Sequence, residues 1–188
     1  MAVYTKINQK EINIINKNFN IDKITSFKGI KQGIENTNYL LKSKNKKYIL
    51  TIFEKRVLQK EIPFFMKLMD NLNNSKINCP KPLKTKENKY LIKLKNKTAC
   101  IVSFLEGKDK KILNMNDCYA IGKIIARMHV VTNKMKLNRK NSMGIRNLKP
   151  LLESIKFKSK KFSNLKVFLK NNLKDINKIG RASCRERV

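Results

Sequence analysis

All strand-like runs of this 188-residue sequence lie before Gly107, and helical patterns and loops follow it. The runs are short and apolar, and they are bounded by glycines or by turns rich in lysine and asparagine, a pattern typical of antiparallel strands. They cover residues 24–27, 38–41, 48–53, 90–92 and 99–105. The sequence therefore predicts an α+β fold, in which an antiparallel sheet is followed by a mainly helical part.

Three helices are predicted around these strands. Asn8 and Glu11 form a capping-box pattern before apolar residues at helical spacing. Residues 59–72 show a second apolar stripe, in which Pro63 is tolerated because it falls in the first turn. Asn116 is predicted to cap a third helix, whose apolar stripe is Ile121, Ile124, Ile125 and Met128.

The change of pattern near Gly107 suggests a division into domains. We expect one lobe over residues 1–107 and part of a helical lobe over residues 108–179, with the boundary at about residues 106–111. Residues 180–188 hold three of the seven arginines and no lysine, unlike the lysine-rich sequence before them. We interpret this tail as a foreign segment that should be left out of fold predictions.

Composition limits the classes of protein that the chain can belong to. Apolar residues make up 41% of it, so it can bury a core, but no run approaches the roughly 20 apolar residues of a membrane-spanning helix. We expect a cytoplasmic protein without a membrane partner. Its four cysteines are widely spaced and show no Cys-x-x-Cys pair, so we expect reduced thiols and no metal site.

The formal charge of +31 allows two interpretations. Dense positive charge is typical of proteins that neutralise phosphates, which makes a basic nucleic-acid-binding module one alternative. However, the chain has far more lysine than arginine and is rich in asparagine and isoleucine, as the proteins of AT-rich genomes are. A solvated lysine surface without a specific nucleic-acid partner is the favoured interpretation; the densest basic stretch, residues 134–174, is the best candidate for an anion-binding face.

Residues 27–39 contain two glycines between two predicted strands. Gly29 and Gly33 could simply form a turn, or they could let backbone amides approach a phosphate closely. The segment is neither a Walker A loop nor a Rossmann loop, because no Gly-Lys-Ser/Thr follows and the loop leads into a strand.

Taken in order, these motifs resemble those of a kinase N-terminal lobe. The glycine-rich hairpin, the strand 48–56, the run Glu61 to Phe65, the Cys-Pro-Lys-Pro segment 79–82, the segment 101–107 and the helix 121–129 together carry the match. The sequence resembles the aminoglycoside-phosphotransferase-like kinases, and within them the homoserine kinases of that type. The resemblance implies a protein-kinase-like bilobal fold that uses ATP and Mg²⁺, and its substrate would be L-homoserine; it leaves the oligomeric state open.

The resemblance also implies site residues. The loop residues Gly29, Lys31, Gly33, Asn36 and Asn38 would cover the ATP phosphates, and Ser103, Phe104 and Leu105 would offer backbone groups to adenine. Glu61 falls where such kinases keep a helix carboxylate that pairs with a strand lysine, but Thr51 occupies the position of that lysine. We therefore predict that Lys31 or Lys55 supplies the phosphate-binding cation. Alternatively, Glu61 only favours the helix dipole, a contribution of about 0.3–1 kcal/mol.

No catalytic loop can be found in the sequence. Phosphoryl transfer in this fold needs an Asp beside the attacking hydroxyl, and an Asn and a second Asp as magnesium ligands, but no His-x-Asp segment occurs. We therefore expect a fragment that is inactive by itself and has neither catalytic nor metal-binding residues. His129, the only histidine, is expected to be structural. A choline or aminoglycoside kinase of the same fold remains an alternative.

Overall fold

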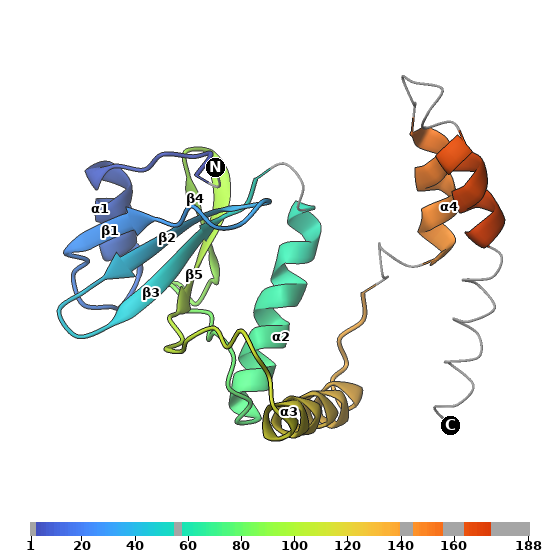
Figure 1. Cartoon of the computed structure of the whole chain (residues 1–188). Helices are drawn as coiled ribbons and strands as arrows, with labels where there is room; N and C mark the ends of the chain where they lie inside the picture. The colour runs from blue at the N-terminus through green and yellow to red at the C-terminus, as the bar shows by residue number, and fades with distance from the viewer. Residues whose placement is uncertain (1–2, 55–57, 140–144, 156–163, 174–188) are drawn as a thin grey trace. The chain divides into compact units, whose positions relative to one another are not determined.

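The computed structural model of the chain describes residues 3–54, 58–139, 145–155 and 164–173 (Figure 1). The chain divides into two compact units, residues 1–137 and 138–188. The first unit contains the sheet, and the described part of the second is helical. The predicted α+β class is therefore confirmed.

The first unit is built on a five-stranded antiparallel sheet in the order β1-β2-β3-β5-β4. The strands are β1 (Ser26–Gly29), β2 (Thr37–Lys42), β3 (Lys47–Ile52), β4 (Leu91–Leu94) and β5 (Lys97–Ser103). Burial alternates along β2 and β3, because successive side chains of a strand point to opposite faces of the sheet. β5 lies between β3 and β4, and most of its residues are buried.

One face of the sheet packs against α1 (Gln9–Asn18) (Figure 1). Asn8 and Glu11 form the predicted capping box at the start of α1. Ile12, Ile15 and Phe19 then face the sheet and are almost completely buried. Their partners in this core include Tyr39, Leu41, Tyr48, Leu50, Ile52, Leu94, Ala99 and Ile101.

The other face packs against α2 (Ile62–Asn74), which follows the short 3₁₀ turn η1 (Gln59–Glu61). Pro63 lies in the first turn of α2, as predicted. Ile62 and Met66 bury their side chains against Cys100 and Val102 of β5. The far end of α2 contacts α3 (Met115–Asn133), where Arg127 donates a hydrogen bond to the Ser75 carbonyl over 3.2 Å.

Some predicted boundaries were wrong by about two residues. The first strand begins at Ser26 instead of Ile24, because the Ile24 side chain is buried in the α1 core and its amide bonds to Asn16 Oδ1 over 3.0 Å. The last strand begins at Lys97, because Lys95 and Asn96 complete a tight hairpin, both with positive φ.

The predicted cap of the third helix was also wrong. Asn114, not Asn116, caps α3, and it forms a capping box with Asp117. The Asn114 side chain accepts from the Asp117 amide over 2.9 Å, and the Asp117 carboxylate accepts from the Asn114 amide over 2.9 Å. The cap of α3 thus lies two residues before the predicted cap residue.

The second unit contains α4 (Ile145–Ser154) and helical residues 164–173. Lys166 joins these two segments, because its Nζ donates to the carbonyls of Glu153 and Ile155 over 3.2 and 3.1 Å. The side chain of Leu152 in α4 is buried. The predicted foreign tail, residues 180–188, lies outside the described residues, and the predicted lobe boundary near residue 107 remains a prediction.

Candidate functional site

One glycine lies within the loop of residues 30–36 between β1 and β2, here called the β1–β2 loop, and a second one directly precedes the loop. Gly33 has a φ of 116°, which side chains rarely tolerate. At Gly29, the last residue of β1, a Cβ atom would lie only 2.9 Å from Cγ2 of Val3, so a larger residue would force the N-terminal segment to shift. Lys31 is exposed on the loop. Both glycines therefore have a structural reason in addition to any role in binding.

Asn38 and Thr51 form a polar pair on the sheet face that also carries α2. They lie opposite each other in the register of β2 and β3, and the Thr51 hydroxyl donates to Asn38 Oδ1 over 2.8 Å. Both residues are half-buried. The position expected to hold a lysine in other kinases thus carries a hydroxyl whose hydrogen bond orients the neighbouring amide.

Glu61 is the last residue of η1 and directly precedes α2. It is half-buried, and its backbone amide donates to the Leu58 carbonyl over 2.9 Å. The helix that it begins packs on the same sheet face as Thr51. Lys55, the second candidate for the phosphate-binding cation, lies outside the described residues, so this role stays a prediction.

Residues 103–105 comprise the last residue of β5 and the two residues that follow it, and they form hydrogen bonds with two neighbouring segments. The Ser103 amide donates to the Lys81 carbonyl over 2.9 Å, and its hydroxyl accepts from the Lys81 amide at the same distance. The Phe104 amide donates to the Lys47 carbonyl over 3.3 Å, and Lys47 Nζ lies 5.3 Å from the Phe104 ring centre. Leu105 is 40% exposed.

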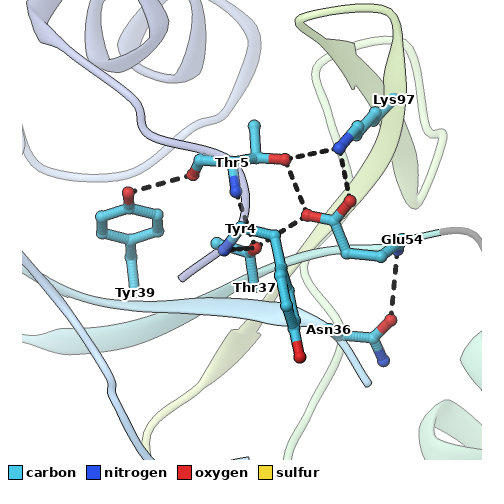
Figure 2. A network of polar contacts seen from close by, with 7 residues as sticks. All are labelled: Tyr4, Thr5, Asn36, Thr37, Tyr39, Glu54 and Lys97. Carbon is cyan, nitrogen blue, oxygen red and sulfur yellow. Dashed lines mark hydrogen bonds and ion pairs between the residues drawn. The ribbon is translucent and has the colours of Figure 1, made fainter. Parts of the chain in front are cut away.

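Sequence analysis missed a network of polar side chains centred on Glu54 (Figure 2). Glu54 Oε1 accepts hydrogen bonds from the hydroxyls of Thr5 and Thr37 over 2.6 and 2.7 Å. Its other oxygen forms an ion pair with Lys97, which also donates to the Thr5 hydroxyl over 2.7 Å. The Glu54 side chain is only 10% exposed, so this charge is held mainly by protein groups.

The network keeps Glu54 ionised. Burial alone would raise the pKa of the carboxyl, but hydrogen bonds from Lys97, Thr5 and Thr37 and the positive charge of Lys97 lower it below its usual value. The ion pair could be anticipated only from the register in which β3 and β5 pair. Ile52 pairs with Ala99, so continuing the ladder by two residues sets Glu54 opposite Lys97.

Other candidates lie away from this region. His129 is exposed on α3, a helix without buried residues, so the expected packing of its side chain is not seen. Among the described residues, no group of three or more acidic, His or Cys side chains could hold a metal ion. Within the same residues, no helix is both long and apolar enough to span a membrane.

Comparison with known proteins identifies a related family. A family model described as "Phosphotransferase enzyme family" matches residues 26–157. A homoserine kinase of Paramagnetospirillum magneticum is 38% identical over 156 residues, which are 83% of this chain and 48% of that protein. One from Parvibaculum lavamentivorans is 36% identical over 154 residues, with shares of 82% and 48%. The chain spans about half the length of the curated relatives that it matches.

Solved structures with the same fold include two antibiotic kinases. An amicoumacin kinase in complex with AMP-PNP and Ca²⁺ matches with a TM-score of 0.66 at 17% identity, over 89% of this chain and 54% of that one. A spectinomycin phosphotransferase in complex with ADP and its antibiotic matches with a TM-score of 0.59 at 18% identity, over 96% and 58%. At such low identity these matches show a shared fold.

Proposed function

Because the chain belongs to the phosphotransferase enzyme family, whose model matches residues 26–157, we propose that it forms the nucleotide-binding half of a homoserine kinase. The observation that carries the proposal is the 38% identity over 156 residues with a homoserine kinase. In the proposed reaction the γ-phosphate of ATP moves to the side-chain hydroxyl of L-homoserine, a step towards threonine. We expect the reaction to take place in the cytoplasm.

The β1–β2 loop is proposed to cover the ATP phosphates. Gly33 within the loop and Gly29 directly before it allow backbone amides to approach the phosphate oxygens closely, and the exposed Lys31 can add a positive charge. Asn36 and Asn38 follow at the end of the loop and the start of β2. Lys55 and Glu61 remain candidates for a second cation and for the carboxylate that orients it.

Adenine is proposed to bind beside residues 103–105. The amides of Ser103 and Phe104 already donate to carbonyls of the chain, so they are poor donors for a ligand. We therefore assign adenine recognition to the Leu105 amide and to the backbone carbonyls of the segment. The neighbouring Phe104 ring and the half-exposed Leu105 side chain supply apolar surface for the base.

The phosphoryl-transfer step itself needs groups that are not assigned to this chain. Mg²⁺ in such a reaction neutralises charge on the phosphate oxygens, and a carboxylate accepts the proton of the attacking hydroxyl. The described residues hold no cluster of acids that fits the metal. We propose that these groups belong to the half of the relatives that the chain does not span, and we expect no turnover from the 188 residues alone.

Nucleotide binding can be tested on the chain itself by titrating Mg²⁺-ATP and following the heat of binding. The Gly33→Ala variant should raise the Kd roughly 5–30-fold, because a side chain at this φ strains the loop by about 1–2 kcal/mol. Gly122→Ala is the matched control, since its Cβ meets no atom within 4 Å and alanine favours the helix. Equal affinities of the two variants would contradict the proposed role of the loop.

The substrate can be tested with a coupled assay of ADP release on a protein that contains this chain and spans the full length of the relatives. We expect turnover with L-homoserine and much less with choline or an aminoglycoside. If the protein preferred choline or an aminoglycoside, it would be assigned to another branch of the same family. Turnover by the 188-residue chain, above a control without enzyme, would contradict its expected inactivity.

A further inference from the structure

Three successive residues at the N-terminus each contact a different point of the β1–β2 loop or its ends. Val3 packs against Gly29, where the loop begins. The Tyr4 hydroxyl donates to the Ile34 carbonyl inside the loop over 2.8 Å. The Thr5 amide donates to Oγ1 of Thr37, where the loop ends, over 3.1 Å. The N-terminal segment therefore follows the loop from one end to the other.

Thr37 uses its complete hydrogen-bonding capacity in these contacts. Its hydroxyl accepts from the amides of Tyr4 and Thr5 over 3.0 and 3.1 Å, and it donates to Glu54 over 2.7 Å. A hydroxyl offers one donor and two acceptor positions, so all three are occupied. The side chain is fully buried, which fixes the first residue of β2 against the N-terminal segment.

Glu54 connects this arrangement to the sheet. Its carboxylate binds Thr5, Thr37 and Lys97 (Figure 2), and its backbone amide donates to Asn36 Oδ1 over 3.3 Å. Hydrogen bonds to an ionised carboxylate are roughly twice as strong as those between neutral groups. One charged residue, two positions after the end of β3, therefore holds the N-terminal segment, the end of the loop and the start of β5 together.

We propose that residues 3–5, Thr37, Glu54 and Lys97, here called the N-terminal clasp, hold the β1–β2 loop in the position that binds nucleotide phosphates. Thr5 and Glu54 are then positioning residues, which act through the loop and do not touch the ligand. The proposal rests on the proposed function for the identity of that ligand. A purely structural network would stabilise the fold without a selective effect on residues 30–36.

Thr5→Val tests the clasp, because it removes the hydroxyl that bonds Glu54 and Lys97 while it keeps the shape of the side chain and the backbone amide. Thr98→Val is the matched control. Thr98 is a buried threonine of β5 whose hydroxyl accepts a hydrogen bond from Lys93. Tyr4→Phe is a second variant that should fold normally, since Tyr4 is 56% exposed and loses only the bond to Ile34.

For each variant of the 188-residue chain, hydrogen exchange of the loop and the Kd for Mg²⁺-ATP are measured. The free energy of global unfolding is measured beside them, so that an effect on the loop can be told from a loss of overall stability. Amide hydrogen exchange of residues 30–36, without nucleotide, should be faster in Thr5→Val and Tyr4→Phe than in Thr98→Val. The Kd for Mg²⁺-ATP should rise about threefold to tenfold in the first two variants, the factor that one lost hydrogen bond corresponds to. The Thr98→Val variant should keep the wild-type Kd.

The outcomes separate the clasp from the proposed function. Unchanged exchange of the loop in both clasp variants overturns the clasp, even if the wild-type chain binds nucleotide. Faster exchange with an unchanged Kd overturns the positioning role. If the wild-type chain does not bind Mg²⁺-ATP at all, the nucleotide-binding function fails and the positioning role fails with it, whatever the exchange shows.

Discussion

At the scale of the residue, the Glu54 carboxylate links stability to pH. Its pKa is lower in the folded chain than its ordinary value of 4.5. A carboxyl with a lowered folded pKa stabilises the fold fully above its unfolded pKa, and this contribution is lost as the pH falls through the folded pKa. Acid should therefore weaken the chain partly through Glu54.

Glu54→Gln is expected to destabilise the chain at neutral pH, because it removes the charge that binds Lys97. The difference in the free energy of unfolding between wild type and variant should begin to shrink near pH 4.5, where the unfolded carboxyl takes up a proton, and should disappear only as the pH falls through the lower pKa of the folded carboxyl. Urea unfolding of both proteins at a series of pH values measures this difference. Glu87→Gln, which removes an exposed ion pair with Lys89, should have little effect. A constant difference across the pH range would contradict the assignment.

Cysteine reactivity is a second property of single residues. Cys100 is buried beneath α2, and burial raises the pKa of its thiol to about 12, so it should resist alkylation in the folded chain. Cys118 is exposed on α3 and should react before Cys100. Mass spectrometry after brief treatment with iodoacetamide, with and without urea, measures the order. Modification of Cys100 at the rate of Cys118 in native buffer would show that the core opens.

At the scale of the element, the cap of α3 gives two substitutions with opposite signs. Asn114→Ala should cost about 1 kcal/mol of helix stability, because it removes the side chain that accepts the Asp117 amide. Asn116→Ala lies inside the helix and should be neutral or stabilising by a few tenths of a kcal/mol, because alanine is the better helix former. Hydrogen exchange of the first α3 turn measures both effects; equal effects would mean that the helix begins elsewhere.

The β4–β5 hairpin can be improved. Its two turn residues, Lys95 and Asn96, have φ values of 47° and 62°. Such two-residue turns favour Asn-Gly, and a lysine in the left-handed region costs about 1–2 kcal/mol. Lys95→Asn with Asn96→Gly should therefore stabilise the first unit by about 1 kcal/mol. A higher midpoint of urea unfolding would confirm this, and a lower one would show that the Lys95 side chain has a role not visible in the turn.

Local sequence patterns predicted much of the fold. The capping box of α1, the position of Pro63 in α2 and the five strands follow from neighbouring residues. The wrong boundaries arose where tertiary contacts decide, as at Ile24, whose side chain enters the core before the strand begins. At α3, two asparagines two residues apart are equally good caps, and only the bond to Asp117 distinguishes them.

The candidate site was less predictable than the fold. Glycine positions in the β1–β2 loop can be found from sequence, because the residue type itself reports an unusual backbone. The Glu54–Lys97 pair joins residues 43 positions apart, and it requires knowledge that β3 pairs with β5 and in which register. No periodicity within either strand contains that information. The role of Lys55 as a phosphate-binding cation remains a prediction.

At the scale of the whole molecule, charge repulsion should oppose folding. The chain has 44 basic and 13 acidic residues, so repulsion between like charges outweighs the attraction of its exposed ion pairs. Salt shortens the Debye length from about 30 Å at 0.01 M to about 10 Å at 0.1 M and weakens that repulsion. The midpoint of urea unfolding should therefore rise over this range of NaCl, and equally in KCl. A falling midpoint would show that ion pairs dominate instead.

The position of β5 in the sheet has a consequence for how the protein is made. Of the five strands in the described sheet, β5 is synthesised last, but it lies between β3 and β4. At about 5–20 residues per second, the roughly 50 residues from the end of β3 to the end of β5 take on the order of 3–10 s to translate. Throughout that interval the nascent chain on the ribosome exposes an unpaired edge of β3, which other chains can bind. Slow translation of this stretch would therefore lengthen the period in which the nascent protein depends on chaperones.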